Sequence, residues 1–224
     1  MQLILDEYLD GLIIERHFLS SSRPWGNYQT DYRPLIEFAR QNRIPVIAAN
    51  APARYVTRVS RLGQDSLETL SPTAKSWLPP LPYPAASPAY AAKFNQFMRG
   101  EMAPPLRTGT PAAPGMNPHA PTRPEAHGTS HLLSAQTLRD ATMGFSIAEH
   151  LKQRSEAMVL HVNGRFHSEG RMGTPEYLLQ YRPKTRVLVI TIASDEGYPD
   201  FDAGRMGRLG DFIIVTDPQL PRSH

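Results

Sequence analysis

The sequence predicts an α/β fold, in which helices flank both faces of a mostly parallel β-sheet. Two observations support this class. Short apolar runs without polar alternation are typical of strands buried on both faces, and segments with apolar residues at helical spacing separate these runs. The length of 224 residues, with 40% hydrophobic and 20% charged side chains, predicts one globular domain over residues 1–224 with a core of its own.

The composition excludes several classes of function. Cysteine is absent, which rules out disulfide bonds, thiolate metal sites and a cysteine nucleophile. The net charge is +3 and like charges form no runs, so the chain lacks the electrostatic footprint of a nucleic-acid-binding protein. No apolar stretch reaches the ~18 residues that a membrane-spanning helix needs, and the first residues show no signal-peptide pattern.

The first part of the chain predicts three helices and one strand. The strand is expected at residues 44–49, because this run is β-branched and has no polar alternation. The helices are expected at 3–13, from Thr30 or Asp31 through Asn42, and at 53–62, where Gly63 suits the position after the last turn.

Prolines are concentrated in the middle of the chain, with 13 of the 22 between residues 71 and 128. Six of them fall in 71–88, which predicts an extended connection rather than a helix. Ser87 and Pro88 then suit the cap and first position of a new helix. The stretch 101–128 has seven prolines and few apolar residues, and is expected to be a mobile surface insertion.

The last part of the chain alternates between predicted helices and strands, which favours a parallel sheet. A long helix is expected from Leu132 to Arg154, and a short one from Thr174 to Tyr181. The apolar runs at 158–162, 186–193 and 212–215 are expected to be strands.

Two turns that follow predicted strands are candidate ligand sites, because ligands of open parallel sheets bind beyond the carboxyl ends of the strands. Asn50 follows the run 44–49, and the segment from Gly164 to His167 follows the run 158–162. We expect Gly164 to let the backbone turn there. His167 suits a metal ligand, a proton carrier or a partner for an anion, or alternatively a histidine that satisfies loop carbonyls.

An aromatic group near the N-terminus is a second candidate site. It comprises Trp25, Tyr28 and Tyr32, and the two tyrosines share a face if both are helical. A deprotonated phenol suits ferric iron, as in tyrosinate-ligated haem, and aromatic rings cover the apolar faces of a haem. The alternative is a buried aromatic cluster without a ligand.

The remaining sequence patterns do not predict a catalytic site. Gln136 and the neighbours Arg139 and Asp140 on the long helix are expected to be exposed, with an ion pair of little energetic weight. A Gly-x-Ser-x-Gly elbow, a P-loop and a Gly-x-Gly-x-x-Gly fingerprint are all absent from the sequence. Most familiar enzyme chemistries therefore have no sequence signature here.

Several motifs in order resemble the ChaN-type haem-binding uptake family, which belongs to a superfamily with Tiki proteases and erythromycin esterases. The resemblance covers nearly the whole chain except the proline-rich insertion. The residues that carry it are Leu5-Asp6-Glu7-Tyr8-Leu9, Arg23-Pro24-Trp25, Tyr28, Asp31-Tyr32-Arg33-Pro34-Leu35, Ile44 to Pro52, Ala135-Gln136, Arg139 to Met143, Gly164, His167, Gly173-Thr174-Pro175, Asp211-Phe212 and Thr216-Asp217.

The resemblance implies a non-catalytic protein of iron or haem uptake that binds haem through a tyrosinate on the iron. Tyr28 and Tyr32 are the first choices for the iron ligand, with Tyr83 behind them. The other cofactor-binding residues expected on this basis are Trp25, Asn50, Gly164 and His167. The resemblance also implies a homodimer, with haem at its interface.

Alternative functions remain open. One is a metal-dependent hydrolase of the Tiki or esterase kind, which would use His167 with acidic groups. Another is a structural or partner-binding module. Members of the family are lipoproteins of the bacterial cell envelope, but this chain carries no signal from which a location can be predicted.

Two departures from the family pattern stand out. Family members begin with a strand, a helix and a strand that carry a first glycine-x-x-histidine motif, so the chain is expected to be an N-terminally truncated member. Ala53 stands where an arginine is common in relatives, which removes a partner for an anion.

Overall fold

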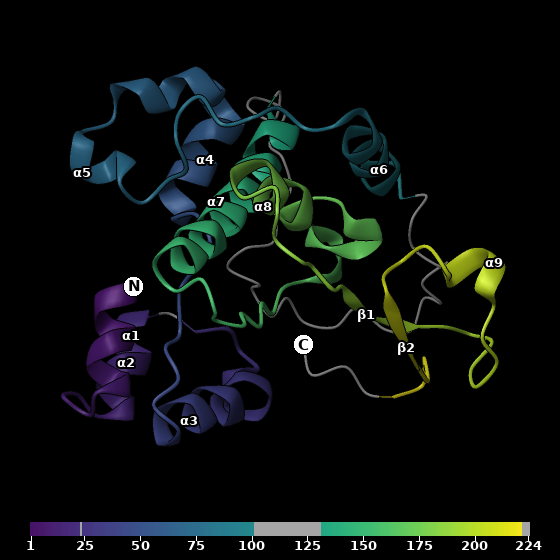
Figure 1. Ribbon diagram of the computed structural model, residues 1–224, viewed down its shortest axis with the longest axis horizontal. Helices are drawn as coiled ribbons and strands as arrows, with labels where there is room; N and C mark the ends of the chain where they lie inside the picture. Colours follow the sequence, from purple (N-terminus) through teal and green to yellow (C-terminus); the bar gives the residue numbers. More distant parts are fainter. Residues whose placement is uncertain (23, 101–130, 221–224) are drawn as a thin grey trace. The chain divides into compact units, whose positions relative to one another are not determined.

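The computed structural model describes residues 1–22, 24–100 and 131–220, and its chain divides into two compact units (Figure 1). The N-terminal unit comprises residues 1–48 and the second unit the described residues from Ala49 onward. The single domain expected from the length stays a prediction. The insertion expected at 101–128 lies outside the described residues.

The N-terminal unit is a small helical assembly around aromatic rings. Its elements are α1 (Gln2–Leu9), α2 (Glu15–Ser22), the π-helical turn η1 (Tyr28–Tyr32) and α3 (Arg33–Gln41). The helix expected over 3–13 ends early, because the chain turns at Gly11, whose φ is +75°. The core of the unit consists of Leu5, Tyr8, Phe18 and Tyr28.

The strand expected at 44–49 is wrong, because these residues pair with no strand in the described part of the chain. The side chain of Gln2 takes the place of a neighbouring strand. Its amide nitrogen donates to the carbonyl of Val46 at 2.9 Å, and its oxygen accepts from the backbone N–H of Ala48 at 2.8 Å. Pro45 has no N–H to offer to a ladder, and Ile47 is exposed.

The second unit is built on the long helix α7 (Leu132–Gln153), close to the extent predicted. It packs against α4 (Ala53–Leu62) and α8 (Thr174–Tyr181). Gly144 permits the contact with α8, because a Cβ at this position would lie 2.7 Å from the backbone nitrogen of Leu178. The main core comprises Ala51, Tyr55, Val56, Val59, Leu67, Leu78, Tyr83, Ala135, Leu138, Ala141 and Tyr177.

The proline-rich connection departs from its prediction in one place. A short helix, α5 (Pro72–Lys75), forms where an extended chain was expected. Pro72 occupies its first turn, where no N–H is needed, and the Ser71 hydroxyl accepts from the Ala74 N–H. The same device starts α6 (Pro88–Met98), where the prediction is confirmed, with Ser87 accepting from Tyr90 N–H at 3.1 Å.

The described residues contain a small parallel sheet of two strands, which agrees with an α/β class in which helices predominate. β1 (Ile190–Ser194) pairs with β2 (Phe212–Thr216), and Ile190 lies opposite Phe212. The run 158–162 is not a strand, which corrects the prediction. Val159 packs inward as a strand residue would, but no strand in the described part of the chain pairs with its backbone.

The remaining short elements are the single turns η2 (Gln64–Thr69), η3 (Arg165–His167), η4 (Glu169–Arg171) and α9 (Ala203–Met206). Among the residues that the structure describes, no helix combines the length and the apolar character needed to cross a membrane.

Candidate functional site

A fully buried carboxyl group, that of Asp140 on α7, is the centre of a polar cluster in the second unit. Its Oδ1 accepts hydrogen bonds from Thr174 Oγ1 at 3.0 Å and from His167 Nδ1 at 2.8 Å, and its Oδ2 accepts from the Tyr90 hydroxyl. These partners come from α6, η3 and α8. The expectation of an exposed ion pair between Arg139 and Asp140 is therefore wrong, because neighbouring helices enclose Asp140.

The hydrogen bond to Asp140 indicates which ring nitrogen of His167 carries the proton. A carboxylate oxygen only accepts, so Nδ1 carries a proton and Nε2 of the neutral ring is left as the basic nitrogen. The amide nitrogen of Gln136 lies 3.3 Å from Nδ1. The imidazole is about one-fifth exposed, so an outside group can reach it. In this arrangement His167 can take a proton or coordinate a ligand, and which of its predicted roles it has stays a prediction.

A buried lysine holds the loop that carries His167. Lys93 Nζ, on α6, donates to the carbonyl of Phe166 at 2.7 Å and lies 3.4 Å from Glu169 Oε1. The same ammonium is 4.4 Å from the centre of the Phe166 ring. Burial lowers the pKa of Lys93, and the charge of Glu169 opposes this shift. Glu169 also pairs with Arg165 at 2.7 Å.

A second histidine lies close to this cluster. His161 Nε2 is buried and has no hydrogen-bond partner within residues 1–22, 24–100 and 131–220. Burial lowers the pKa of His161, the neighbouring His167 lowers it further, and Asp140 raises it. Burial thus favours the neutral form of the ring. Within residues 1–22, 24–100 and 131–220, no group of three histidine, aspartate or glutamate side chains converges so as to hold a metal ion.

Two glycines near His167 differ in what they require. Gly164 has a φ of −65°, and the nearest atom to an added Cβ would be 3.9 Å away. The expectation that the turn needs a glycine there is wrong, because any residue adopts this conformation. At Gly173 the φ is +69°, and a Cβ would lie 2.7 Å from the carbonyl of His167 and 3.1 Å from Asp140 Oδ1. The cluster can close only because Gly173 has no side chain.

The predicted aromatic group lies in the N-terminal unit, where its members differ in exposure. Trp25 and Tyr32 form a tilted pair with ring centres 4.6 Å apart, and Trp25 is 39% exposed. Tyr28 is buried against Phe18, with ring centres 6.0 Å apart. Its hydroxyl is enclosed and has no hydrogen-bond partner among the residues that the structure describes. The pair of Trp25 and Tyr32 is thus accessible to a ligand, whereas the Tyr28 hydroxyl is not.

Burial raises the pKa of both tyrosines. For Tyr28 the carboxylates of Glu15 and Glu37 raise it further, and for Tyr32 the carboxylate of Asp31 does so. A phenolate at either position therefore needs a cation at its oxygen.

The other predicted residues lie elsewhere in the second unit. The Tyr83 hydroxyl donates to the carbonyl of Ser134 at 2.8 Å, so it is already engaged in the core. Asn50 is exposed, and no hydrogen bond of its side chain is found among the described residues. Of the residues predicted for this part of the chain, His167 belongs to the Asp140 cluster. Asn50 and Gly164 make no side-chain contact with that cluster.

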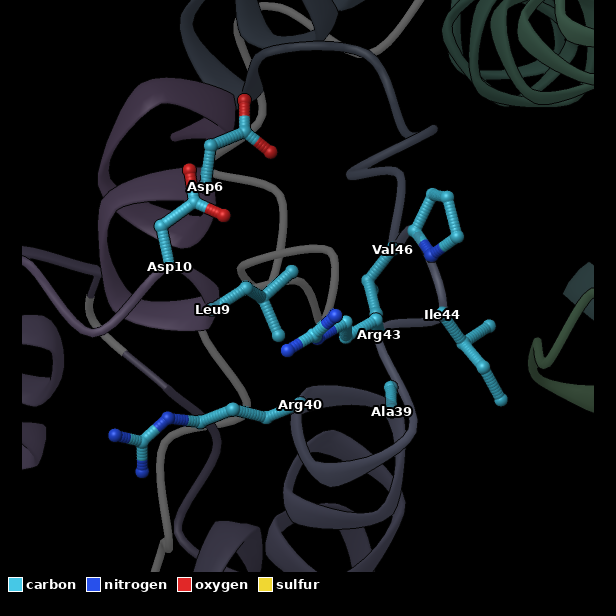
Figure 2. Close-up of a pocket in the computed structure, with 9 residues that line it drawn as sticks. Asp6, Leu9, Asp10, Ala39, Arg40, Arg43, Ile44 and Val46 are labelled. Carbon is cyan, nitrogen blue, oxygen red and sulfur yellow. The ribbon is translucent and has the colours of Figure 1, made fainter.

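A surface pocket of about 470 Å³ lies in the N-terminal unit (Figure 2). Figure 2 shows the side chain of Arg43 extending toward Leu9, whereas Arg40 extends away from the other lining residues. Two arginines and two aspartates line it, so it carries no net charge for an anionic ligand. Its walls are formed by Asp6, Leu9, Asp10, Ala39, Arg40, Arg43, Ile44, Pro45 and Val46.

The described residues form a mixed helical structure with a small parallel two-stranded sheet, compatible with an α/β fold, in which His167 is paired with the buried Asp140. A family model described as "Haem-binding uptake, Tiki superfamily, ChaN" matches residues 1–178, so the chain belongs to this family. The match includes both candidate sites and ends before β1. No curated protein and no solved structure matches the chain.

Sequence reasoning missed most of the polar cluster. Tyr90, Lys93 and Glu169 gave no signal, because an isolated lysine or tyrosine on a helix is usually exposed or part of a core. Asp140 and Thr174 were visible only as members of motifs that the family resemblance contained. The signal that would have found them is the glycine of Gly173-Thr174-Pro175, which marks a close approach of two segments.

Proposed function

We propose that this protein binds haem without turning it over, in iron or haem uptake at the bacterial cell envelope, and that Tyr32 supplies the iron ligand. The family supports haem binding. The observation that carries the ligand assignment is the aromatic pair in which the partly buried Tyr32 lies beside the exposed Trp25. A phenol beside an accessible indole offers both a hard oxygen ligand and an apolar surface for a porphyrin.

The three tyrosines considered differ in what an incoming iron would have to displace. At Tyr83 it would break the hydrogen bond to Ser134, and at Tyr28 it would have to enter a closed core lined by Phe18 and Tyr8. Tyr32 is only partly buried, and no hydrogen bond of its hydroxyl is found in the described part of the chain. Its phenol is therefore the one that needs least rearrangement.

The donor set fits haem in its chemistry. Ferric haem, when bound, supplies the positive charge that stabilises a phenolate against the raised pKa of Tyr32. Trp25 would cover part of the macrocycle. The bidentate pair of Arg33 with Glu15, at 2.6 and 3.1 Å, stabilises the start of α3 and with it the turn that holds Tyr32.

Titration of the protein with ferric haem tests this proposal. The wild-type chain is expected to give a shifted Soret band with the features of tyrosinate ligation. Tyr32→Phe should remove these features and weaken binding by about tenfold or more, which corresponds to about 1.4 kcal/mol of binding free energy. Tyr28→Phe is the matched control and should leave the spectrum unchanged. A spectrum lost in Tyr28→Phe but kept in Tyr32→Phe would reverse the assignment, and no spectral change with the wild-type chain would reject haem binding.

The pair of Asp140 and His167 favours a second candidate, hydrolysis of an ester or amide. A histidine whose Nδ1–H is bound by a buried carboxylate has a basic Nε2 that can take a proton from water. This candidate predicts metal-stimulated hydrolysis of a chromogenic ester that His167→Ala abolishes and Tyr32→Phe does not change. Absence of hydrolysis above a buffer blank, with and without added divalent metal, would remove it.

A further inference from the structure

The turn that carries His167 begins with an Asn-Gly pair, Asn163 and Gly164, and the sequence contains no other pair of this kind. In such a pair the backbone nitrogen of the glycine can reach the side-chain amide of the asparagine, because glycine has no Cβ to hinder the approach. Their reaction converts the asparagine to aspartate or isoaspartate. Whether it proceeds in a folded protein depends on the hydrogen bonds and the exposure of the two reacting groups.

The attacking group, the backbone N–H of Gly164, is free to react. No acceptor for this N–H is found among the described residues, whereas the carbonyl of Gly164 accepts from the His167 N–H at 2.9 Å. Gly164 is exposed, and neither it nor Asn163 belongs to a helix or a strand. Hydroxide can therefore remove the amide proton, and no backbone ladder has to open before the nitrogen turns toward the Asn163 side chain.

The group under attack, the side-chain amide of Asn163, is polarised by a neighbour. Ser168 Oγ donates to Asn163 Oδ1 at 3.0 Å. A donor at this oxygen stabilises the negative charge that develops on it when the Gly164 nitrogen attacks. The amide nitrogen of Asn163, which has to leave, is held by no hydrogen bond in the part of the chain that the structure describes. Both features favour the reaction.

We propose that Asn163 is a site of spontaneous deamidation, assisted by the Ser168 hydroxyl, that places a negative charge in the turn that carries His167. The deprotonated Gly164 nitrogen forms a bond to Asn163 Cγ. The bond from Cγ to the amide nitrogen breaks, and that nitrogen leaves with a proton as ammonia. Water then opens the cyclic imide at one of its two carbonyls, which gives aspartate or isoaspartate. The reaction consumes water, releases ammonia and needs no oxidant or reductant.

The product changes the surroundings of His167. The hydrogen bond between Asn163 and Ser168 spans the turn, and His167 lies within it. Aspartate at this position replaces a neutral acceptor with a carboxylate, and isoaspartate also inserts a methylene group into the main chain. We therefore expect the modification to disturb the placement of the His167 ring against Asp140, which the unmodified turn holds at 2.8 Å.

Incubation of the full haem-free chain in mildly alkaline buffer tests the proposal. Peptide mapping should show a mass gain of about 1 Da at Asn163. Cation-exchange chromatography should separate the product, because the net charge falls below +3. Methylation by an isoaspartyl methyltransferase should detect the isoaspartate form. Asn50 is the control within the same chain, since it is exposed but precedes Ala51, and it should stay intact over the same period.

Three variants separate the effect of the structure from that of the sequence pair. Gly164→Ala suits the backbone, whose φ is −65°, and should slow the reaction by about tenfold or more because its Cβ hinders the attack. Ser168→Ala should slow the reaction by about threefold or more, since it removes the donor from the amide oxygen. Ser168→Thr keeps the hydroxyl and should keep the rate. Circular dichroism should show that all three variants are folded.

The purified isoaspartate form tests the effect on the turn. The ring signals of His167 in its NMR spectrum should shift, whereas those of His150, about 15 Å further along α7 than Asp140, should not. Unshifted His167 signals would contradict the expected disturbance of the turn.

Two results would overturn the assignment of Asn163. One is an Asn163 that stays intact in the folded chain but is modified in the urea-unfolded chain. The other is an equal rate of deamidation in Ser168→Ala and in the wild-type chain. Either result would leave the haem-binding proposal intact, because Tyr32 lies in the N-terminal unit and takes no part in this turn.

Discussion

In the second unit, both carboxyl oxygens of Asp140 are buried and bound by side chains from three neighbouring elements, whereas in the N-terminal unit the buried hydroxyl of Tyr28 has no partner. Both groups lie in closed cores. In the core around Asp140, the hydrogen bonds of the carboxyl group fix the arrangement of the neighbouring side chains. The core around Tyr28 tolerates a buried hydroxyl that makes no hydrogen bond among the described residues. Burial of a polar atom alone therefore does not identify a site in this protein.

The two cores differ in which residue types they require. The Asp140 cluster needs particular donors at particular places, so it is sensitive to single substitutions. The aromatic core depends more on shape, because Tyr8 and Phe18 stack with ring centres 4.8 Å apart, although the Tyr8 hydroxyl also donates to Glu37. Four predictions, ordered by the size of the expected effect, test this contrast.

Removing the central carboxyl group should have the largest effect. Asp140→Ala leaves the Tyr90 and Thr174 hydroxyls and the His167 N–H buried without an acceptor, and should lower the free energy of unfolding by about 3–5 kcal/mol. Urea denaturation measures this. The exposed Asp65 provides the control, since Asp65→Asn should change stability by less than about 0.5 kcal/mol. Equal effects of the two substitutions would contradict the central role of Asp140.

The two glycines next to His167 should respond in opposite ways. Gly173→Ala forces a side chain into a backbone at φ +69° and against the carbonyl of His167, and should cost about 1–3 kcal/mol. Gly164→Ala, at φ −65°, should be neutral or stabilise by about 0.4–1 kcal/mol, because alanine restricts the unfolded chain. Thermal unfolding of both variants distinguishes them. A larger loss for Gly164→Ala would show that the turn does need a glycine.

The buried His161 should make stability depend on pH. Its folded pKa is below the ordinary value of 6.5, so the unfolded chain binds more protons in acid. Its contribution is therefore fully present above about pH 6.5 and is lost as the pH falls toward the folded pKa, by at most about 1.4 kcal/mol per pH unit. Urea denaturation at a series of pH values should show this slope, and His161→Phe should flatten it. The exposed His17 is the control, since His17→Gln should keep the slope.

The aromatic core should show the smallest effect. Tyr28→Phe removes a buried hydroxyl that has no partner, so the free energy of unfolding should stay the same or rise by up to about 1 kcal/mol. In the second unit, Tyr83→Phe removes a hydroxyl that donates to Ser134, and stability should fall by about 1 kcal/mol. If Tyr28→Phe is the more destabilising change, the Tyr28 hydroxyl has a partner in solution.

The helices were predictable to the degree that local signals define them. Gly63 after α4 and the Ser87-Pro88 start of α6 act through backbone groups of the same segment, so they are visible in the sequence. The strands were less predictable, because an apolar run becomes a strand only when another strand pairs with it. The runs 44–49 and 158–162 have the composition of strands, but one is paired by the side chain of Gln2 and the other by no strand in the described residues.

The residues of the candidate site were also predictable only where a local signal marks them. His167 was found because it follows an apolar run and a glycine. The sequence predicts an exposed Asp140, because a charged pair on a helix does not reveal which hydrogen-bond donors other segments place next to it. Tyr90 and Lys93 could not be found, since their roles depend on α6 lying against the loop from Gly164 to Arg171.

By itself, the sequence determined the helix boundaries that caps and prolines mark, the absence of thiol chemistry and the membership of a haem-binding family. The tertiary structure decided which polar side chains are buried together, how far each tyrosine is buried and which of the described apolar side chains are exposed. The physical reason is the separation along the chain of the residues that interact. Capping and proline geometry act within a few residues, whereas the burial of Asp140 and the exposure of Ile192 depend on segments that are far apart in the chain and meet only in the folded protein.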